Sequence, residues 1–252
     1  MAIQGVIFDL GHTLMHLDGT WPEVFDRGRA DLQAFLGAQG LDLDAASFAR
    51  TLLDRRAEGY DRAKATQREV TAVESMRWTF ARFGLVDPAP DLLQGAIDAF
   101  FAYEYDHWQA DPEALPLLKD LAARGLRLGM FSNATDDSFI QRLVDRFGFR
   151  PWLEPALSSA GTGIRKPDPA AFAPILDVWG LEPGSITVVG DTLDADILGA
   201  NRAGMQGVWI RARQDARQEG AAPALEALGA PIPNAIIDRL AQLPEALIGD
   251  LQ

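Results

Sequence analysis

Residues 5–14 read GVIFDLGHTL, and this stretch sets the interpretation of the whole sequence. Its first four residues, Gly5–Phe8, form a continuous apolar run, which is typical of a strand buried on both faces of a parallel sheet. Asp9 follows the run directly. Because ligands of open α/β sheets bind outside the carboxyl ends of the strands, the stretch predicts an acidic side chain at the binding edge of such a sheet.

Further short apolar runs predict the other strands: Leu126–Phe131, Pro155–Ser158, Ile186–Val189, Gly207–Ile210 and Ala235–Ile237. Helical segments separate most of these runs. Asp111 and Asp168 each precede a proline, as an N-cap precedes the first turn of a helix, and a third helix is expected from Asp194, as its cap, to Ala203. The alternation of strand and helix predicts an α/β fold with a Rossmann-like parallel sheet.

The interval between the first two predicted strands is different, because it shows helical periodicity and no strand pattern. The helical segments are Val24–Leu36, Ala46–Ala65, Val70–Phe83 and Leu92–Tyr105. Such a gap is too long for an ordinary crossover, so residues 17–105 are predicted to form an inserted helical cap. Residues 1–16 and 106–252 then form the core, with a surface excursion at Gln214–Pro233.

Composition excludes several classes of site and partner. The 252 residues include no cysteine, which excludes disulfides, thiolate metal sites and a cysteine nucleophile. No apolar run is long enough to span a bilayer, and no export signal is visible, so a cytoplasmic protein is expected. The net charge of −13 disfavours nucleic acid and anionic membranes as partners. The sequence leaves the oligomeric state open.

Polar side chains follow the predicted strands. Asp9 follows the first, Ser132 and Asn133 the second, and Asp191 a later one, while Lys166 lies between them in the sequence. A Mg²⁺ ion held by two carboxylates can cancel the repulsion between an anionic nucleophile and a phosphate monoester. One carboxylate can then attack phosphorus, Lys166 can neutralise the oxygens, and Ser132 with neighbouring N–H groups can hold the phosphate.

Four segments, in this order, resemble the haloacid dehalogenase-like hydrolase superfamily, phosphatase branch with a helical cap. The matching positions are Asp9 and Thr13, Ser132, Lys166-Pro167, and Gly190, Asp191 and Asp196. The resemblance implies a Mg²⁺-dependent phosphatase that hydrolyses a small phosphorylated metabolite through an aspartyl-phosphate on Asp9. It also implies Mg²⁺ ligation by Asp9, the Gly11 carbonyl and Asp191, substrate binding by Ser132, Asn133 and Lys166, and hydrogen bonding by Asp196 near Lys166 or a metal-bound water.

One position departs from the family pattern. Gly11 stands where the family carries the aspartate that serves as general acid and base, a role that typically contributes about 10²–10⁴-fold to the rate. Three interpretations stay open. The first is a phosphatase that either acts best on good leaving groups or uses His12 to supply the proton. The second is a dehalogenase that attacks carbon, and the third is a non-catalytic relative that binds a phosphorylated ligand or a protein. Dehalogenases of the family need no magnesium and lack the Gly-Asp pair, so Asp191 favours the phosphatase.

Two assignments have structural alternatives. His12 is counted among the catalytic candidates because it lies three residues from Asp9 and a histidine side chain ordinarily titrates near neutral pH, although its place slightly favours a packing role. The basic residues Arg55, Arg56, Arg62 and Lys64 lie in the expected cap. We expect them to form a solvated helix face rather than a binding site.

Overall fold

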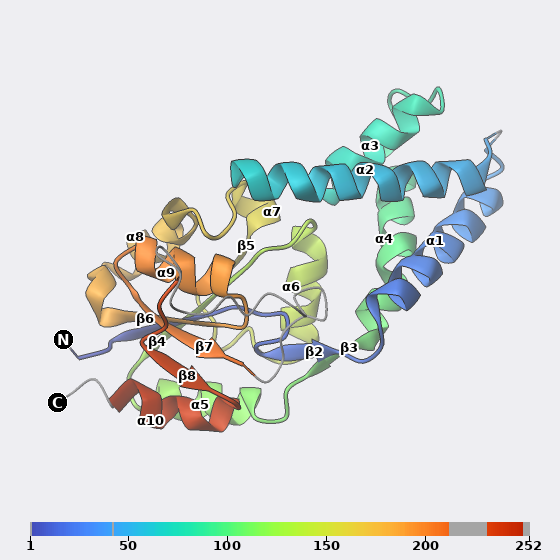
Figure 1. Cartoon of the computed structure of the whole chain (residues 1–252). Coiled ribbons are helices and arrows are strands. Elements are labelled where there is room, and N and C mark those ends of the chain that lie inside the picture. Colours follow the sequence, from blue (N-terminus) through green and yellow to red (C-terminus); the bar gives the residue numbers. More distant parts are fainter. Residues whose placement is uncertain (1, 42, 212–230, 249–252) are drawn as a thin grey trace.

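A computed structural model describes residues 2–41, 43–211 and 231–248. Its main sheet has six strands in the order β5-β4-β1-β6-β7-β8, and every neighbouring pair is parallel. The strands are β1 Gly5–Phe8, β4 Arg127–Ser132, β5 Ala156–Ser158, β6 Ile186–Gly190, β7 Gln206–Ile210 and β8 Ala235–Ile237 (Figure 1). Each lies within one residue of a run predicted from the sequence, so the Rossmann-like α/β class is confirmed.

The first strand occupies the middle of the sheet. β1 pairs with β4 on one side, with Phe8 opposite Met130, and with β6 on the other, with Phe8 opposite Val189. The backbone N–H of Asp9 donates to the Val189 carbonyl at 2.8 Å and extends this pairing by one residue. The sheet therefore extends from β1 in both directions, through β4 on one side and through β6 on the other. Such a topological switch point is where open α/β sheets bind ligands.

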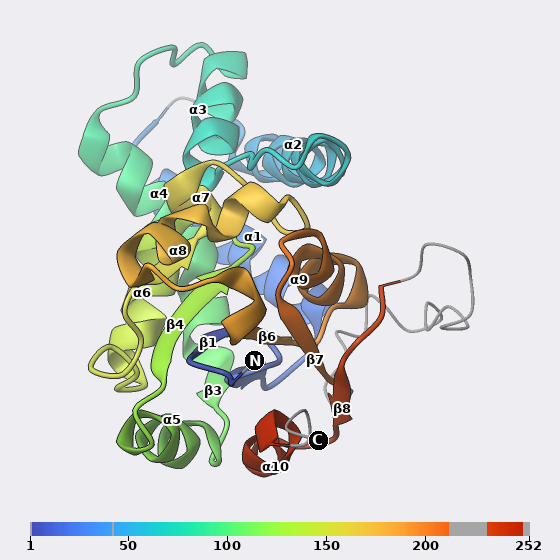
Figure 2. The same ribbon diagram turned by 90° about the vertical axis from the view of Figure 1, so that its left-hand side faces the viewer.

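Helices cover both faces of the sheet (Figure 2). Val6 and Phe8 face an apolar cluster that includes α5 (Ala114–Ala123), α6 (Asp137–Arg146) and the start of α10 (Leu243–Ile248), whereas Ile7 faces a second cluster. That second cluster includes α8 (Ala173–Trp179), preceded by the 3₁₀ turn η1 (Pro169–Phe172), and α9 (Leu198–Arg202). The period of two along β1 therefore buries alternate side chains on opposite faces.

Four longer helices follow β1 before the second strand of the main sheet: α1 Trp21–Ala38, α2 Ala45–Thr66, α3 Ala72–Arg82 and α4 Pro90–His107. All four match helices predicted from the sequence. Three have side-chain N-caps, from Thr20, Asp44 and Thr71, which satisfy amide groups that a first turn leaves unbonded. They lie together on the side of the sheet from which β1 and β4 emerge at their carboxyl ends (Figure 1).

The structure adds one element that the sequence did not predict. β2 (Met15–Leu17) and β3 (Trp108–Ala110) form a two-stranded antiparallel ribbon at the two points where the chain enters and leaves the four helices. Three residues per strand give too short an alternation to recognise in a sequence. The ribbon joins the two connections by backbone pairing and places Trp108 beside Gly11 and His12.

Helix starts also differ from expectation. α5 begins at Ala114, and Asp111 instead accepts a hydrogen bond from the Glu113 N–H in the turn before it. The third helix begins as a π-helical turn, η3 (Leu193–Ile197), and Asp194 makes no capping bond there, so its predicted capping role is wrong. Two short helices, α7 (Ser159–Thr162) and the 3₁₀ turn η2 (Pro183–Ser185), lie in the connections, and a third turn, η5 (Leu240–Gln242), precedes α10.

Most of the predicted surface excursion at 214–233 lies outside the described residues. No helix in the described part of the chain is long and apolar enough to cross a membrane.

Candidate active site

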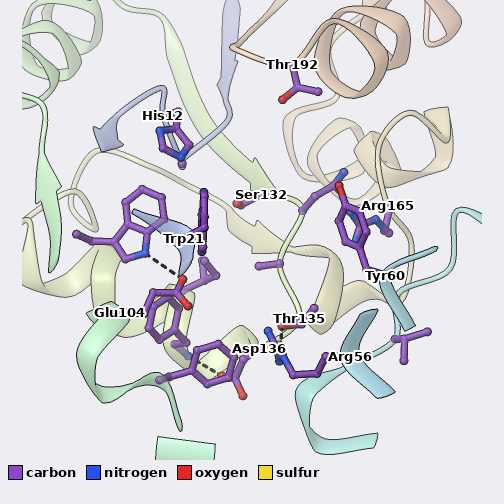
Figure 3. A pocket seen from close by; sticks show the side chains of 18 of the residues that line it. His12, Trp21, Arg56, Tyr60, Glu104, Ser132, Thr135, Asp136, Arg165 and Thr192 are labelled. Atoms are coloured by element: carbon purple, nitrogen blue, oxygen red, sulfur yellow. Dashed lines mark hydrogen bonds between the residues drawn. The ribbon is translucent and has the colours of Figure 1, made fainter. Parts of the chain in front are cut away.

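Three adjacent strands bring the predicted polar residues to one rim of the sheet. Asp9 follows β1, Ser132 is the last residue of β4, and Asp191 follows β6. Because β4 and β6 are the two neighbours of β1, these residues must lie close together once the sheet forms. All three are at least nine-tenths buried and line one cavity (Figure 3, where Ser132 is labelled).

Carboxylate oxygens of Asp9, Asp191 and Asp196 lie within 4.8 Å of one another. Oxygen ligands at this spacing suit a hard divalent cation such as Mg²⁺, which binds through one or two carboxylates and keeps several waters. Burial raises the pKa of the Asp191 carboxyl well above its ordinary value, and the charges of Asp9 and Asp196 raise it further. Crowded, desolvated carboxylates of this kind favour a bound cation, so the donor set fits a metal site.

Lys166 supplies the positive charge of the cluster. Its side chain is 1% exposed, and its ammonium contacts Asp9 Oδ1 at 2.7 Å, Asp196 Oδ1 at 2.6 Å and the Phe131 carbonyl at 2.7 Å. The contacts with Asp9 and Phe131 are hydrogen bonds, and the contact with Asp196 is an ion pair. Burial alone would lower the pKa of Lys166, but the charges of Asp196 and Asp9 outweigh it and raise the pKa to about 12. Lys166 is therefore a fixed cation throughout the physiological range.

The π-helical turn η3 explains how Asp196 reaches the cluster. Oδ2 of Asp196 accepts a hydrogen bond from the Thr192 N–H at 2.9 Å, while Oδ1 of Asp196 forms an ion pair with Lys166. A Cβ on Gly190 would lie 2.2 Å from Asp196 Cγ, so only glycine leaves room for this carboxylate. Asp196 is expected from the sequence to lie near Lys166 or near a metal-bound water, and the structure has it against Lys166. Its role as a hydrogen-bond acceptor in the reaction stays a prediction.

Asn133 holds the Lys166 backbone rather than facing the cavity with its amide. Its Oδ1 accepts from the Lys166 N–H and its Nδ2 donates to the Lys166 carbonyl, both at 2.9 Å. The side chain thus fixes the segment that carries the ammonium. Substrate binding by Asn133 stays a prediction and would have to use its backbone N–H.

An indole fills the space beside Gly11. A Cβ at this position would lie 3.4 Å from Cη2 of Trp108, and the His12 ring packs edge-on against the same indole with centroids 5.3 Å apart. Trp108 Nε1 donates to the buried carboxylate of Glu104 on α4 at 3.2 Å (Figure 3). The site therefore carries a tryptophan next to Gly11, the position where the family that the sequence resembles is expected to carry an aspartate, and His12 packs against the same indole.

The cavity above the rim has a volume of about 670 Å³. Its other wall comes from α1, α2 and α4, and includes Trp21, Arg56, Tyr60 and Glu104 (Figure 3). The guanidinium of Arg56 lies over the Phe100 and Phe101 rings, 4.9 and 5.0 Å from their centroids, and donates to Thr135 Oγ1 at 3.4 Å.

The expectation of a solvated basic face is thus wrong for Arg56, which helical periodicity alone could not separate from its neighbours. Arg55 lies instead over the Trp78 ring, and neither Arg62 nor Lys64 lines this cavity. The sequence carries one signal that Arg56 faces the cavity. Arg56 lies four residues, about one helical turn, before Tyr60 and therefore on the same face of the helix.

Comparison with known proteins agrees with these observations. The family model "haloacid dehalogenase-like hydrolase" matches residues 3–204. Phosphoglycolate phosphatase of Rhodospirillum rubrum is 31% identical over 203 residues, which cover 80% of this chain and 77% of that protein. Glyceraldehyde 3-phosphate phosphatase of Methanopyrus kandleri is 33% identical over 125 residues, 50% of this chain and 53% of that protein. The chain thus matches about half the length of the first two curated relatives.

A solved structure points to the other chemistry of the same fold. The 2-haloacid dehalogenase of Pseudomonas syringae pv. Tomato DC3000 superposes with a TM-score of 0.70 at 27% identity, covering 98% of this chain and 99% of that chain. A phosphatase from Thermococcus onnurineus shares the fold with a TM-score of 0.62 at 18% identity.

Proposed function

The chain belongs to the haloacid dehalogenase-like hydrolase family and is a hydrolase, and from this premise we propose that it is a Mg²⁺-dependent phosphatase of a small phosphorylated metabolite. The observation that carries the proposal is the set of three buried carboxylates around one buried lysine at the switch point of the sheet. Asp191 is its decisive member, because a second carboxylate beside the nucleophile suits a metal-assisted attack on phosphorus, whereas attack on a neutral carbon needs no metal.

The reaction starts with Asp9. Its carboxylate attacks phosphorus, the P–O ester bond breaks, and an aspartyl-phosphate forms that water later cleaves. Lys166 holds Oδ1 of Asp9 at 2.7 Å, which leaves the carboxylate oriented and offsets the charge that gathers there. Ser132 holds phosphate oxygens from the neighbouring strand. A Mg²⁺ ion held by Asp9, Asp191 and the Gly11 carbonyl would supply the charge that lets phosphate approach the carboxylates.

The leaving alcohol needs a proton that Gly11 cannot give. His12 is the nearest titratable candidate in sequence and lines the same cavity, and histidine is the side-chain type most often used for proton transfer. We propose His12 for this step. If its role is only to pack against Trp108, turnover depends on substrates whose leaving groups depart without a proton.

We also propose that residues 17–105 act as a cap on a core of residues 1–16 and 106–252. The ribbon β2–β3 crosses the two connections and gives the cap a defined hinge. A cap in this position encloses the cavity and excludes water from the acyl-phosphate chemistry. Its residues Arg56 and Tyr60 then face the part of the substrate that leaves.

A dehalogenase is the second candidate. The likeness to the Pseudomonas syringae 2-haloacid dehalogenase and the absence of an aspartate at position 11 favour it. It predicts halide release from 2-haloacids without metal, so Asp191 would have no metal to hold.

One screen separates the two functions. Wild type, Asp9→Asn and Asp194→Asn are assayed with phosphate monoesters and with 2-haloacids, each with Mg²⁺ and with EDTA. The phosphatase proposal expects Mg²⁺-dependent phosphate release that Asp9→Asn abolishes and Asp194→Asn retains, since Asp194 is exposed on the same turn as Asp196 and outside the acidic cluster. Halide release that persists in EDTA would instead establish the dehalogenase, and no turnover of either kind would refute both.

A further inference from the structure

The loop after α2 pairs with the loop that carries Lys166. Helix α2 ends at Thr66, its C-cap residue Gln67 has a left-handed φ of 56°, and the chain then turns toward the core. The Arg165 N–H donates to the Gln67 carbonyl and the Glu69 N–H donates to the Gly163 carbonyl, both at 3.0 Å. These two bonds form a short antiparallel pairing centred on Arg68 and Ile164. A segment of the proposed cap is therefore bonded to the residue next to the catalytic lysine.

A buried ion pair crosses the same junction. Arg165 Nη1 donates to both carboxylate oxygens of Glu69, at 3.0 and 2.8 Å, and the Glu69 side chain is 1% exposed. The Ser159 hydroxyl donates to Oε2 of Glu69 at 2.5 Å, and the Val70 N–H donates to Oε1 at 3.1 Å. The carboxylate thus binds a guanidinium, a hydroxyl and an amide at once.

Glu69 is linked by hydrogen bonds to the loop of Lys166 and to the loop of Ser132. Arg165 directly precedes Lys166, whose backbone Asn133 also holds on the other side. The Ser159 hydroxyl accepts a hydrogen bond from the Ala134 N–H at 2.9 Å, two residues after Ser132. One carboxylate from the cap side therefore reaches the Lys166 loop through Arg165 and the Ser132 loop through Ser159.

Stability alone is a poor reason for this arrangement. Removing two charges from water costs several kcal/mol, and their attraction in the interior roughly offsets that cost, so buried ion pairs are weak evidence for stabilisation. A specific geometric task accounts better for a carboxylate that accepts four hydrogen bonds from three donor groups, on Arg165, Ser159 and Val70. If the cap moves away from the core, this pair separates and both charges return to water.

We propose that Glu69 is a positioning residue that couples closure of the cap to alignment of Lys166 and the Ser132 loop. When the cap closes, the Glu69 carboxylate engages Arg165 and Ser159, and Lys166 is held against Asp9. When the cap opens, the loop loses its clamp and the site relaxes. This coupling rests on the proposed function for its effect on turnover, but its mechanical part concerns only the two loops.

The test compares two ion pairs that both join the cap helices to the core. Glu69→Gln keeps the shape of the buried side chain and removes its charge. The control is Asp98→Asn, because Asp98 on α4 pairs with Arg142 on α6 at 3.2 Å while both side chains are about two-fifths exposed and touch no catalytic loop. Glu69→Gln is expected to lower kcat about 10–100-fold with KM changed less than threefold, since small misplacements of reacting groups have effects of this size. Asp98→Asn is expected to stay within twofold.

Hydrogen exchange gives a readout that does not depend on activity. In Glu69→Gln, peptides covering residues 161–168 and 67–71 should exchange faster, while peptides of β1 and β6 stay as in the wild type. If Glu69→Gln fails to fold, Ser159→Ala takes its place, because it removes one bond to Glu69 and one to Ala134 and keeps the volume nearly unchanged.

Each result decides the matter. Unchanged kcat together with unchanged exchange of residues 161–168 overturns the coupling, as does an equal loss in Asp98→Asn. If the wild type releases no phosphate, the proposed function fails, while faster exchange of these peptides in Glu69→Gln still supports the mechanical link. Slower turnover without any change in exchange would show that Glu69 acts otherwise than by holding the loop.

Discussion

The two walls of the cavity are built in different ways. On the sheet side, Asp9 and Asp191 directly follow strands, and Lys166 comes from the loop after α7. All three are almost fully buried, Lys166 pairs with Asp9, and the Asp9 and Asp191 carboxylates lie within 4.8 Å of each other. On the cap side, Arg56 and Tyr60 project from helix α2 and are held by aromatic stacking. The first wall has little freedom to change without losing its charge balance, whereas the second can vary in size and polarity. We infer that the sheet wall performs the chemistry and the cap wall selects the substrate.

The largest effect is expected at the centre of the sheet wall. Lys166→Met removes the ammonium that three contacts hold and leaves three buried carboxylates without their cation. We expect kcat/KM to fall about 10³-fold, as when one preorganised electrostatic group is lost. We also expect the free energy of unfolding without metal to fall by about 3–5 kcal/mol, as when a buried ion pair is broken.

Steady-state kinetics and urea unfolding measure these two effects. Lys119→Met is the control, because Lys119 is exposed on α5 and lies outside the cavity. A Lys166→Met protein with normal turnover would mean that the sheet wall is structural.

The boundary between the two walls is tested by Gly11→Asp. Gly11 has no left-handed backbone angle, and the new Cβ would meet Trp108 at an ordinary contact distance of 3.4 Å, so the fold should tolerate the change. A general acid typically contributes about 10²–10⁴-fold. Because Trp108 restricts the new carboxylate, we expect a gain of about 10–100-fold, confined to phosphate esters with poor leaving groups.

Two comparisons sharpen this experiment. Gly11→Asn introduces a side chain of the same shape that cannot act as a general acid, and it should give no gain. In the wild type, His12→Ala should lower turnover of poor leaving groups and spare good ones. Equal rates for Gly11→Asp and Gly11→Asn would show that proton donation at this position does not limit the reaction.

The cap wall is tested by Arg56→Ala. Loss of this guanidinium from the cavity should raise KM about tenfold for an anionic substrate, the size of about 1.4 kcal/mol of binding, with kcat changed little. Arg55→Ala is a close control, since Arg55 is the neighbouring residue but stacks on Trp78. A fall in kcat with unchanged KM would place Arg56 in the chemistry and break the division between the two walls.

The last comparison is a pH-dependent response of stability to Mg²⁺. Burial raises the pKa of Asp196 to about 6, with Asp9 adding to the shift and Lys166 opposing it. An acid with a raised folded pKa contributes stability below its ordinary pKa of 3.8, and that contribution is lost as the pH rises through about 6. Mg²⁺ should compensate this loss where the carboxylates are ionised.

Thermal unfolding with and without Mg²⁺ at pH 5 and pH 8 measures the response. At 100 times its Kd, a ligand adds about 2.7 kcal/mol, so we expect Tm to rise by roughly 5–10 °C at pH 8. The rise should be less than half as large at pH 5 and absent in Asp191→Asn. An equal rise at both pH values would contradict metal binding by this cluster.

Much of the site could be predicted from local sequence. The run Gly5–Phe8 and the acid after it define a strand and a strand end, and the same holds for β4 with Ser132 and for β6 with Asp191. Parallel pairing does the rest, because carboxyl ends of neighbouring parallel strands meet at one edge. The predicted helices α1–α4 follow from periodicity in the same way, since a period of 3.6 residues is a property of a single segment.

The sequence by itself determined the strands of the main sheet, the four long helices and the rim residues, because each follows from the pattern of one short segment, and the order of four such segments indicated the family. Only the tertiary structure decided which helix face meets the cavity, that Trp108 fills the space beside Gly11, and that Glu69 pairs with Arg165 across 96 positions of the chain. These facts depend on the packing of distant segments. A buried charge pair leaves no periodic trace in the sequence, since its two members are ordinary surface residue types until folding removes them from water.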